Sequence, residues 1–300
     1  VETETTTLCD RRCKMCEILY WKKGDQVRRH MSFDEFKHMM DQFERLVWSN
    51  VTGEGSSFLN PDYPKMLKYL HDERKASVWF VDHLDSMSFK QLKDQVLPYV
   101  HGIYVSMDGA TKETYENIKQ GCDYDRVIQN LHKIIEYKRR YKTPFPHLTF
   151  RYIMMKDNMH EVPYFLRMIR SIASPGEWGG SSSRVEFTGL LSFPEIKKYE
   201  AETVPESVLT QLRIMDDEEG IPFIFNHPEQ KRNPPCHTCT AWYEPYLMMP
   251  GYVLPCCAVM MSNNRPFLRR CSFGNLFHEN IGDVWNSEKY RKFRELIVNP

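Results

Sequence analysis

The sequence predicts an α/β fold in which a parallel sheet curls into a partial barrel, with a smaller unit at its carboxyl end. Short segments rich in β-branched and aromatic residues alternate with longer segments of helical periodicity. Parallel strands need such crossover connections, and right-handed crossovers curl the sheet. Nine cysteines gather mainly near the two ends of the 300 residues. We therefore expect a partial (β/α)6 TIM-like barrel followed by a small cysteine-rich domain.

Six segments have the composition of buried or half-buried strands. They are the residues leading to Cys9, then 47–51, 76–81, 102–107, 146–154 and 184–190. Helical periodicity predicts helices over 33–46, 62–74, 88–98, 111–120, 124–140, 160–172 and 205–217. Ser32 and Thr111 precede two of these helices and are their expected N-caps, because their hydroxyls can accept from the first free backbone N–H groups.

The remaining segments divide the chain at changes of composition. Residues 174–183 are rich in Gly and Ser, so we expect a connection without regular structure there. Residues 191–235 predict a bridge with one helix, and a closing helix is expected near 284–297. The expected domains are a barrel over 1–200, a bridging segment over 201–235 and a small domain over 236–300.

Composition excludes several classes of protein. The 40 basic residues balance the 40 acidic ones, and 41% of the residues are apolar, which is enough for a sizeable core and excludes a disordered chain. Zero net charge argues against a nucleic-acid partner, because phosphate binding usually needs a basic face. The apolar runs are too short to span a membrane, and no secretory signal precedes Val1. A cytoplasmic protein is the expectation.

The first cysteine cluster has the pattern of an incomplete ligand set. Cys9, Cys13 and Cys16 lie within eight residues, and no further Cys or His follows in the next ten. Structural zinc sites close their shell with four ligands, whereas thiolates are the usual ligands of iron–sulfur clusters. Three thiolates on a four-iron cluster would leave one iron open. The alternatives are a chance trio or a set completed by a distant residue.

The spacing CxxxCxxC after a first strand resembles the signature of the radical S-adenosylmethionine (radical SAM) superfamily. The resemblance implies a [4Fe–4S] cluster whose open iron chelates S-adenosylmethionine. One electron from that cluster then cleaves the sulfonium and yields a 5′-deoxyadenosyl radical, which removes a hydrogen atom from the substrate. Met15 occupies the position before the third cysteine, where the family usually has an aromatic or large apolar residue.

Two further segments carry the same resemblance. Gly53-Glu54-Gly55 follows the second expected strand and resembles the family's glycine–glutamate motif, although the usual order is Gly-Gly-Glu. The family's motif holds the amino group of S-adenosylmethionine. Residues 104–119 resemble a segment of family members that carry a SPASM or related C-terminal domain. The resemblance makes Ser106, Asp108 and Lys119 cofactor-binding residues, with lysine replacing the commoner arginine.

The second cysteine cluster resembles the hairpin of SPASM and twitch domains. Its ordered features are a CxxC pair, Gly251, the doublet Cys256-Cys257 and a last cysteine. The resemblance implies one auxiliary [4Fe–4S] cluster, for which we expect the ligands Cys236, Cys239, Cys256 and Cys271. Cys257 is the alternate ligand, buried beside them or free to donate hydrogen. Structural zinc is the competing interpretation, because the same spacing suits a zinc ribbon.

Cys122 lies outside both clusters, at the start of a helix. Its position there could lower the pKa of its thiol, but we expect an ordinary, partly exposed cysteine.

Together these resemblances imply an enzyme that abstracts hydrogen from an unactivated C–H bond. We expect a carbohydrate-like or other small natural-product substrate that is oxidised, epimerised or decarboxylated, and a reducing partner such as flavodoxin or ferredoxin. The runner-up is a peptide or protein maturase that makes a crosslink or inverts a stereocentre. Hypotheses of other classes are a non-catalytic iron–sulfur electron carrier and a zinc-stabilised binding module.

Overall fold

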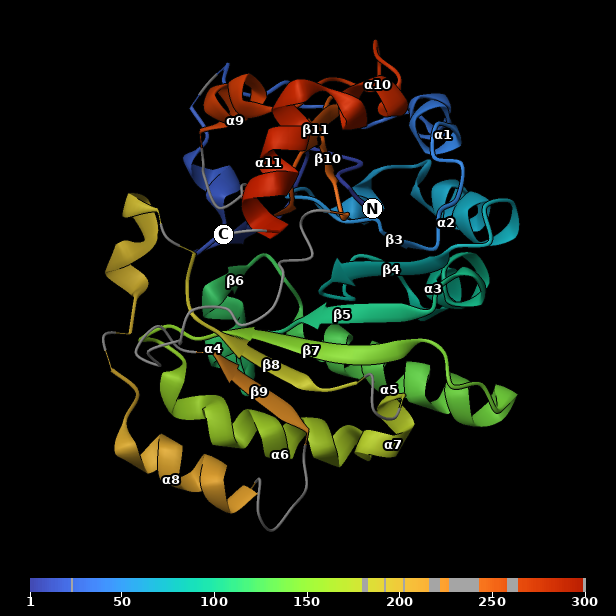
Figure 1. The fold of residues 1–300 in the computed structure, drawn as a ribbon. Helices are drawn as coiled ribbons and strands as arrows, with labels where there is room; N and C mark the ends of the chain where they lie inside the picture. The colour runs from blue at the N-terminus through green and yellow to red at the C-terminus, as the bar shows by residue number, and fades with distance from the viewer. Residues whose placement is uncertain are drawn as a thin grey trace. The chain divides into compact units, whose positions relative to one another are not determined.

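The computed structural model describes the chain except residues 23, 180–182, 192, 202, 216–221, 227–242, 258–263 and 299–300. The chain divides into two compact units. We name residues 1–10, 16–79 and 232–300 the terminal unit, and residues 11–15 and 80–231 the central unit. Each unit is an α/β assembly whose strands run mostly parallel (Figure 1).

In the terminal unit the carboxyl end of the chain adds strands beside the amino end. The strand order is β11-β10-β1-β3-β4. The strands are β1 (Glu2–Thr3), β3 (Trp48–Asn50), β4 (Ser77–Asp82), β10 (Tyr246–Met248) and β11 (Tyr252–Leu254), and β4 continues into the central unit. Strand β1 pairs in parallel with β3 on one side and with β10 on the other. The hairpin β10–β11 therefore extends the sheet from the edge of β1 that β3 leaves open.

The helices of the terminal unit fall into an early and a late group. They are η1 (Glu17–Tyr20), α1 (Phe33–Asp41), η2 (Ser57–Leu59), α2 (Tyr63–Asp72), α9 (Arg265–Cys271), α10 (Ile281–Asn286) and α11 (Glu288–Val298). Helices α1 and α2 pack against each other (Figure 1). Leu268 of α9 joins a core cluster with Tyr246, Met248 and Leu254 of the hairpin, so α9 packs on the apolar face of β10–β11.

In the central unit the strand order is β4-β5-β7-β8-β9. The strands after β4 are β5 (Gly102–Ser106), β7 (His147–Ile153), β8 (Val185–Thr188) and β9 (Phe223–Asn226), and they pair in parallel. A separate two-stranded ladder joins β2 (Arg12–Cys13) to β6 (Lys119–Gln120). The helical segments are α3 (Phe89–Gln95), η3 (Leu97–Tyr99), α4 (Lys112–Ile118), α5 (Tyr124–Tyr141), η4 (Met159–Glu161), α6 (Val162–Ile172), α7 (Pro175–Trp178), η6 (Pro194–Tyr199) and α8 (Glu206–Ile214).

The six expected strands and the seven expected helices all form, with shifts of a few residues at their ends. Ser32 caps α1 in a full capping box with Glu35, and the Thr111 hydroxyl accepts from the N–H of Thr114 to cap α4. The parallel order of the strands confirms the predicted α/β class. None of the described helices combines the length and apolar character needed to cross a membrane.

Two of the expectations about secondary structure are wrong. Residues 174–183 contain the short helix α7, because Ser174 and Glu177 form a capping box and Pro175 fits the first turn. Trp178 at its end is fully buried, with its ring 5.4 Å from that of Phe150. The segment 191–235 holds more than one helix, because η6 precedes α8 and the strand β9 follows it and pairs with β8. The apolar residues of β9 number only three, which is too short a run to stand out in the sequence.

A buried ion pair ties the late helices of the terminal unit to its first strands. The Glu4 carboxylate lies 2.8 Å from Nη2 of Arg265, and both side chains are fully shielded from solvent. Glu4 also accepts from the N–H of Met249 at 2.9 Å. The Arg265 guanidinium lies 4.4 Å from the centre of the Trp21 ring. Because both charges have left water, each needs the other to offset its desolvation.

We expect Arg265→Met to lower the free energy of unfolding by about 3–5 kcal/mol, because it leaves the Glu4 charge buried without a partner. Urea unfolding followed by circular dichroism measures the loss. Arg213→Ala is the control, since its ion pair with Glu206 is exposed and worth at most about 1 kcal/mol. Adding Glu4→Gln to Arg265→Met should recover part of the loss, and an equal or larger loss in the double variant would contradict the ion-pair explanation.

Candidate active site and metal ligands

The segment around Cys13 is held in place by backbone pairing within the central unit. Cys13 on β2 lies opposite Lys119 on β6, and the N–H of Lys14 donates to the carbonyl of Ile118 at 2.9 Å. The neighbouring side chain of Arg11 forms an ion pair with Asp85 at 3.1 Å. These contacts fix the direction of the Cys13 side chain, which is 8% exposed.

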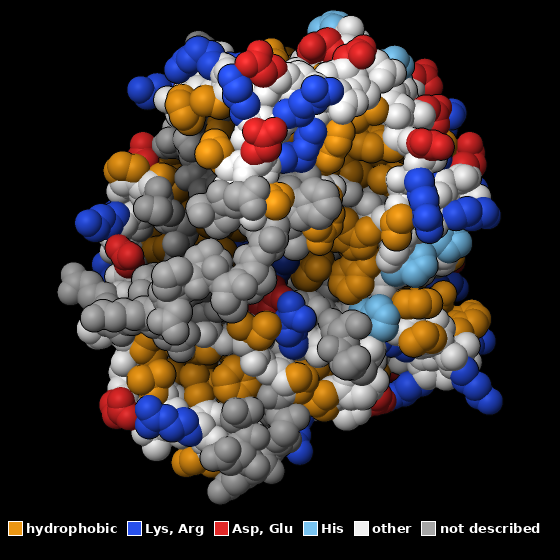
Figure 2. All heavy atoms as spheres, viewed as in Figure 1, with side chains coloured by type: hydrophobic (Ala, Val, Ile, Leu, Met, Phe, Trp, Pro, Cys, Tyr) orange, Lys and Arg blue, Asp and Glu red, His pale blue; other side chains and the backbone are white. Residues whose placement is uncertain are grey.

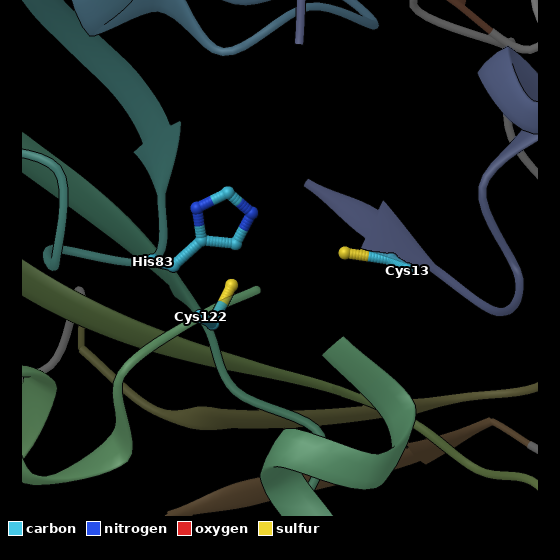
Figure 3. Close-up of side chains that lie close together, drawn as sticks. All are labelled: Cys13, His83 and Cys122. Atoms are coloured by element: carbon cyan, nitrogen blue, oxygen red, sulfur yellow. The ribbon is translucent and has the colours of Figure 1, made fainter. Parts of the chain in front are cut away.

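Cys13 lies beside an imidazole and a second thiol. The sulfur atoms of Cys13 and Cys122 and a ring nitrogen of His83 all lie within 4.8 Å of one another. Figure 3 shows the three groups facing each other, with His83 following β4 and Cys122 following β6. A hydrogen bond from Cys122 is the largest cause that lowers the pKa of Cys13 to about 4, with further help from Lys119 and His83 against the effect of burial. The lowered pKa favours the thiolate, the form in which cysteine binds iron.

The expectation of a partly exposed Cys122 is wrong. Its side chain is 7% exposed, and its contact with Cys13 followed by burial raises the pKa of its thiol. Ladder β2–β6 brings this residue to Cys13, although more than a hundred positions separate the two in the sequence. No local pattern announces such a contact, so sequence reasoning missed it.

Ser106, Asp108 and Lys119, the expected cofactor-binding residues of this segment, lie in contact with one another. The Lys119 ammonium lies 2.8 Å from Oδ2 of Asp108 and donates to Oγ of Ser106 at 2.8 Å. Lys119 and Asp108 are 3% and 0% exposed. Burial opposes the charge of Lys119, but Asp108 and Cys13 outweigh it and raise the pKa of the amine. The ammonium thus stands between a carboxylate and the Cys13 thiolate.

Glu161 is a supporting residue that the sequence did not reveal. Its carboxylate accepts from the N–H of Ala110 and from the hydroxyls of Thr111 and Thr114, each at 2.7 Å. A buried acceptor at this place satisfies free donors in the first turn of α4, so it fixes the helix that leads to Lys119. The N-cap threonine was visible in the sequence, but its distant partner was not.

The Gly53-Glu54-Gly55 segment lies in the terminal unit against the chain that leads out of β1. A Cβ atom on Gly53 would meet Cγ of Glu4 at 2.3 Å, and one on Gly55 would meet the carbonyl oxygen of Thr6 at 2.5 Å. Both positions therefore need glycine for close backbone approach. The N–H of Glu54 donates to Glu4 at 3.2 Å. Burial, followed by the neighbouring Glu4, raises the pKa of Glu54 to about 7 despite the favourable charge of Arg265.

Glu17 adds a third carboxylate to this group and was not predicted. Glu17 is 1% exposed, and neither of its carboxylate oxygens forms a hydrogen bond with a described residue. The nearby Trp21 indole acts to lower the pKa of Glu17, but other causes outweigh it. Burial and then Glu54 raise the pKa of Glu17 to about 10. Burial and mutual repulsion keep Glu17 and Glu54 from ionising fully beside Glu4, so a ligand ammonium group at this place would favour their charged forms.

The C-terminal hairpin has the shape that its sequence predicts. Gly251 adopts a φ of 83° in the turn between β10 and β11, a conformation that favours glycine. Asn275 supports the turn by donating from its side chain to the carbonyl of Pro250 at 2.9 Å. Cys256 follows β11 and is half-buried, and Cys271 ends α9. Of the two alternatives for Cys257, burial beside the ligands is wrong, because the residue is exposed just after the hairpin. Cys236 and Cys239 lie outside the described residues.

The residues present fit the implied groups. Cys13 supplies a buried thiolate, and Cys9 and Cys16 are half-buried. Among the described residues, the group close enough to hold a single metal ion contains Cys13 but neither Cys9 nor Cys16. This agrees with a trio of cysteines that binds three different irons of one cluster rather than one ion. Met15 is buried in the central unit.

On the face shown in Figure 2, acidic and basic side chains are interspersed and form no single-sign field.

Comparisons with known proteins agree with this chemistry. A sequence profile of the radical SAM superfamily matches residues 3–169, and a profile of the SPASM iron–sulfur cluster-binding domain matches residues 236–299. A Pyrococcus furiosus protein, the "tungsten-containing aldehyde ferredoxin oxidoreductase cofactor-modifying protein", is 21% identical over 314 residues, which cover 99% of this chain and 83% of the relative.

Solved structures show the same fold. SuiB of Streptococcus suis bound to S-adenosylmethionine superposes with a TM-score of 0.68 at 13% identity, over 98% of this chain and 67% of SuiB. SuiB bound to the precursor peptide SuiA gives a TM-score of 0.65 at 14% identity, over 98% of this chain and 66% of SuiB.

Proposed function

The chain belongs to the radical SAM superfamily and carries a C-terminal SPASM domain, and we propose that it is an enzyme that removes a hydrogen atom from an unactivated C–H bond of a small, non-peptide substrate. The observation that carries the proposal is the buried Cys13 side chain on β2 opposite Lys119 on β6, inside the chain segment that the superfamily profile covers. Neither a structural zinc module nor a simple electron carrier needs a cofactor-binding lysine at this place.

In this proposal Cys9, Cys13 and Cys16 hold the cluster that binds S-adenosylmethionine. When bound, the reduced cluster and S-adenosylmethionine supply the oxidant that takes the hydrogen atom, and a flavodoxin- or ferredoxin-type partner supplies the electron. Pairing of β2 with β6 holds Cys13 in its direction, so that this thiolate is preorganised for its iron.

Two groups of residues orient S-adenosylmethionine in the proposed site. Glu54 accepts from the amino group, and Gly53 and Gly55 let the backbone of that loop lie close to the neighbouring chain. Lys119 binds the carboxylate together with Ser106. A lysine has three N–H donors; Ser106 takes one, and the ion pair with Asp108 holds the ammonium in place, so donors remain for a ligand. Met15 lines the cofactor from the segment between Cys13 and Cys16.

The auxiliary cluster is assigned to the C-terminal domain. A SPASM domain implies auxiliary iron–sulfur clusters, and we assign one, with Cys236, Cys239, Cys256 and Cys271 as its ligands. Cys257 is the alternate ligand or a hydrogen donor, and its exposure is compatible with the second role. Among the described cysteines, Cys256 follows the hairpin β10–β11 and Cys271 ends α9, so a cluster that binds both would link these short elements.

The substrate class rests on the relative that matches the chain almost from end to end. Its description names a cofactor-modifying protein, which supports a small organic scaffold that is oxidised, epimerised or decarboxylated. The second candidate is a peptide maturase. It is favoured by the likeness to SuiB, whose structure was solved with its precursor peptide, although this chain spans only about two thirds of SuiB.

Iron analysis tests the ligand assignment. The reconstituted chain should hold about eight irons, and replacing Cys9, Cys13 and Cys16 together by Ala should remove about four of them. Cys256→Ala should instead remove the irons of the auxiliary cluster and leave those of the cluster held by Cys9, Cys13 and Cys16. Inductively coupled plasma spectrometry measures the metals, and a chain that holds about one or two zincs and no iron would refute the proposal.

Glu54→Gln should weaken the binding of S-adenosylmethionine by about tenfold to a hundredfold, because it removes a charge-assisted hydrogen bond without changing shape. Equilibrium dialysis of the reconstituted protein measures the dissociation constant. A carboxyl group with a pKa of about 7 loses its charge as the pH falls, so wild-type affinity should drop between about pH 7.5 and 6 while the variant's changes less. Glu206→Gln, at an exposed position on α8, is the control.

The substrate class is tested by the release of 5′-deoxyadenosine. The reduced enzyme is incubated without oxygen with a cell extract that contains both metabolites and peptides, and with the same extract after exhaustive digestion by a protease that is then inactivated. Stimulation that survives digestion supports the small-molecule proposal, and stimulation that digestion abolishes supports the peptide maturase. A reduced chain that holds its clusters and S-adenosylmethionine yet never cleaves it would be an electron carrier.

A further inference from the structure

A thiol and an imidazole with no place in the proposed ligand set lie against Cys13. Cys122 is as deeply buried as Cys13 itself, and His83 contributes a ring nitrogen within the same 4.8 Å group. The Cys122 sulfur points toward the other two residues (Figure 3). Nδ1 of His83 is shielded from solvent and lies 4.0 Å from Oδ1 of Asp85, too far for a hydrogen bond among the described residues. Burial of two polar groups beside one sulfur calls for a role in the site.

The chemistry of the three groups fixes the direction of any hydrogen bond between them. A cysteine that ligates iron is a thiolate and can only accept. A neutral thiol carries one S–H and an imidazole at least one N–H, so Cys122 and His83 each have a donor available for the Cys13 sulfur that they face. Hydrogen bonds to the ligand sulfurs are among the factors that set the reduction potential of an iron–sulfur cluster.

We infer that Cys122, assisted by His83, is a positioning residue that donates to the ligand sulfur of Cys13 and raises the reduction potential of the cluster that binds S-adenosylmethionine. The inference rests on the proposed function in one respect, that Cys13 ligates this cluster. Reduction adds one electron and no proton, so the cluster and its thiolates become more negative. A donor that points at one of those sulfurs stabilises the reduced state more than the oxidised one.

Lys119 does not replace this contribution. Its ammonium lies close to the carboxylate of Asp108 and donates to the hydroxyl of Ser106. Much of its charge is therefore compensated by Asp108, whereas the thiol of Cys122 directs an uncharged donor toward the sulfur. Removing Cys122 should change the potential of this cluster while Lys119, Asp108 and Ser106 stay in place.

The test is a potentiometric titration of the reconstituted full chain followed by electron paramagnetic resonance. The proteins are wild type, Cys122→Ala, which removes the donor, and Cys122→Ser, which keeps one. The cluster that binds S-adenosylmethionine is recognised because its signal changes when S-adenosylmethionine is added. The signal of the auxiliary cluster does not change and serves as an internal reference in every sample.

Cys122→Ala should lower the ratio of reduced to oxidised cluster at a fixed potential by about threefold to tenfold, and tenfold corresponds to ~59 mV for a one-electron couple. Cys122→Ser should restore most of the difference, and the reference signal should titrate as in wild type. His83→Phe should lower the ratio in the same direction.

Three results would overturn the inference. An unchanged ratio in Cys122→Ala, with the cluster present, refutes it alone. Loss of about four irons from Cys122→Ala would make Cys122 a ligand. A wild-type chain whose signals never respond to S-adenosylmethionine would refute the proposed function itself, so the two failures are distinguishable.

Discussion

Burial of the Glu4–Arg265 pair is the constraint on which the terminal unit depends. Each charge would be very costly to bury alone, so strand β1 and helix α9 must keep their positions together. Glu4 also receives the N–H of Glu54 and that of Met249, which come from opposite parts of the chain. One carboxylate therefore connects the loop that is proposed to hold S-adenosylmethionine with the hairpin of the C-terminal domain. A substitution at Glu4 should therefore disturb the loop and the hairpin together.

The central unit follows a similar principle with a different pair. Asp108 and Lys119 are buried together, and backbone pairing places Lys119 opposite Cys13. Glu161 then holds the first turn of the helix between them. The site is thus built from residues whose charges are compensated before any ligand arrives, which limits the reorganisation that binding requires.

Local patterns predicted most of the fold, and distant contacts account for what they missed. Strands and helices could be predicted because their signals, hydrophobic periodicity and capping residues such as Ser32, involve residues that are close together in the sequence. Helix α7 was not predicted because the glycines and serines of this segment suggest a loop and outweigh the capping box at its start. Strand β9 was not predicted because its run of apolar residues is short. Motifs predicted that Ser106 and Lys119 act together. Glu17, Cys122 and Glu161 carry no motif, since their roles exist only once the chain has folded.

The two-residue ladder between β2 and β6 has an evolutionary consequence. Side chains alternate between the faces of a strand, so a slip of one position would turn Cys13 away from its present direction and exchange Lys119 for a neighbour. Insertions and deletions accumulate easily in most surface turns. The stretch from Lys119 to Cys122 differs, because both of its end residues contact Cys13 and an added or lost residue would move one of them away. Among descendants of this gene, the length of that stretch should vary far less than its composition, and a change in length there would mark a copy released from selection for its chemistry.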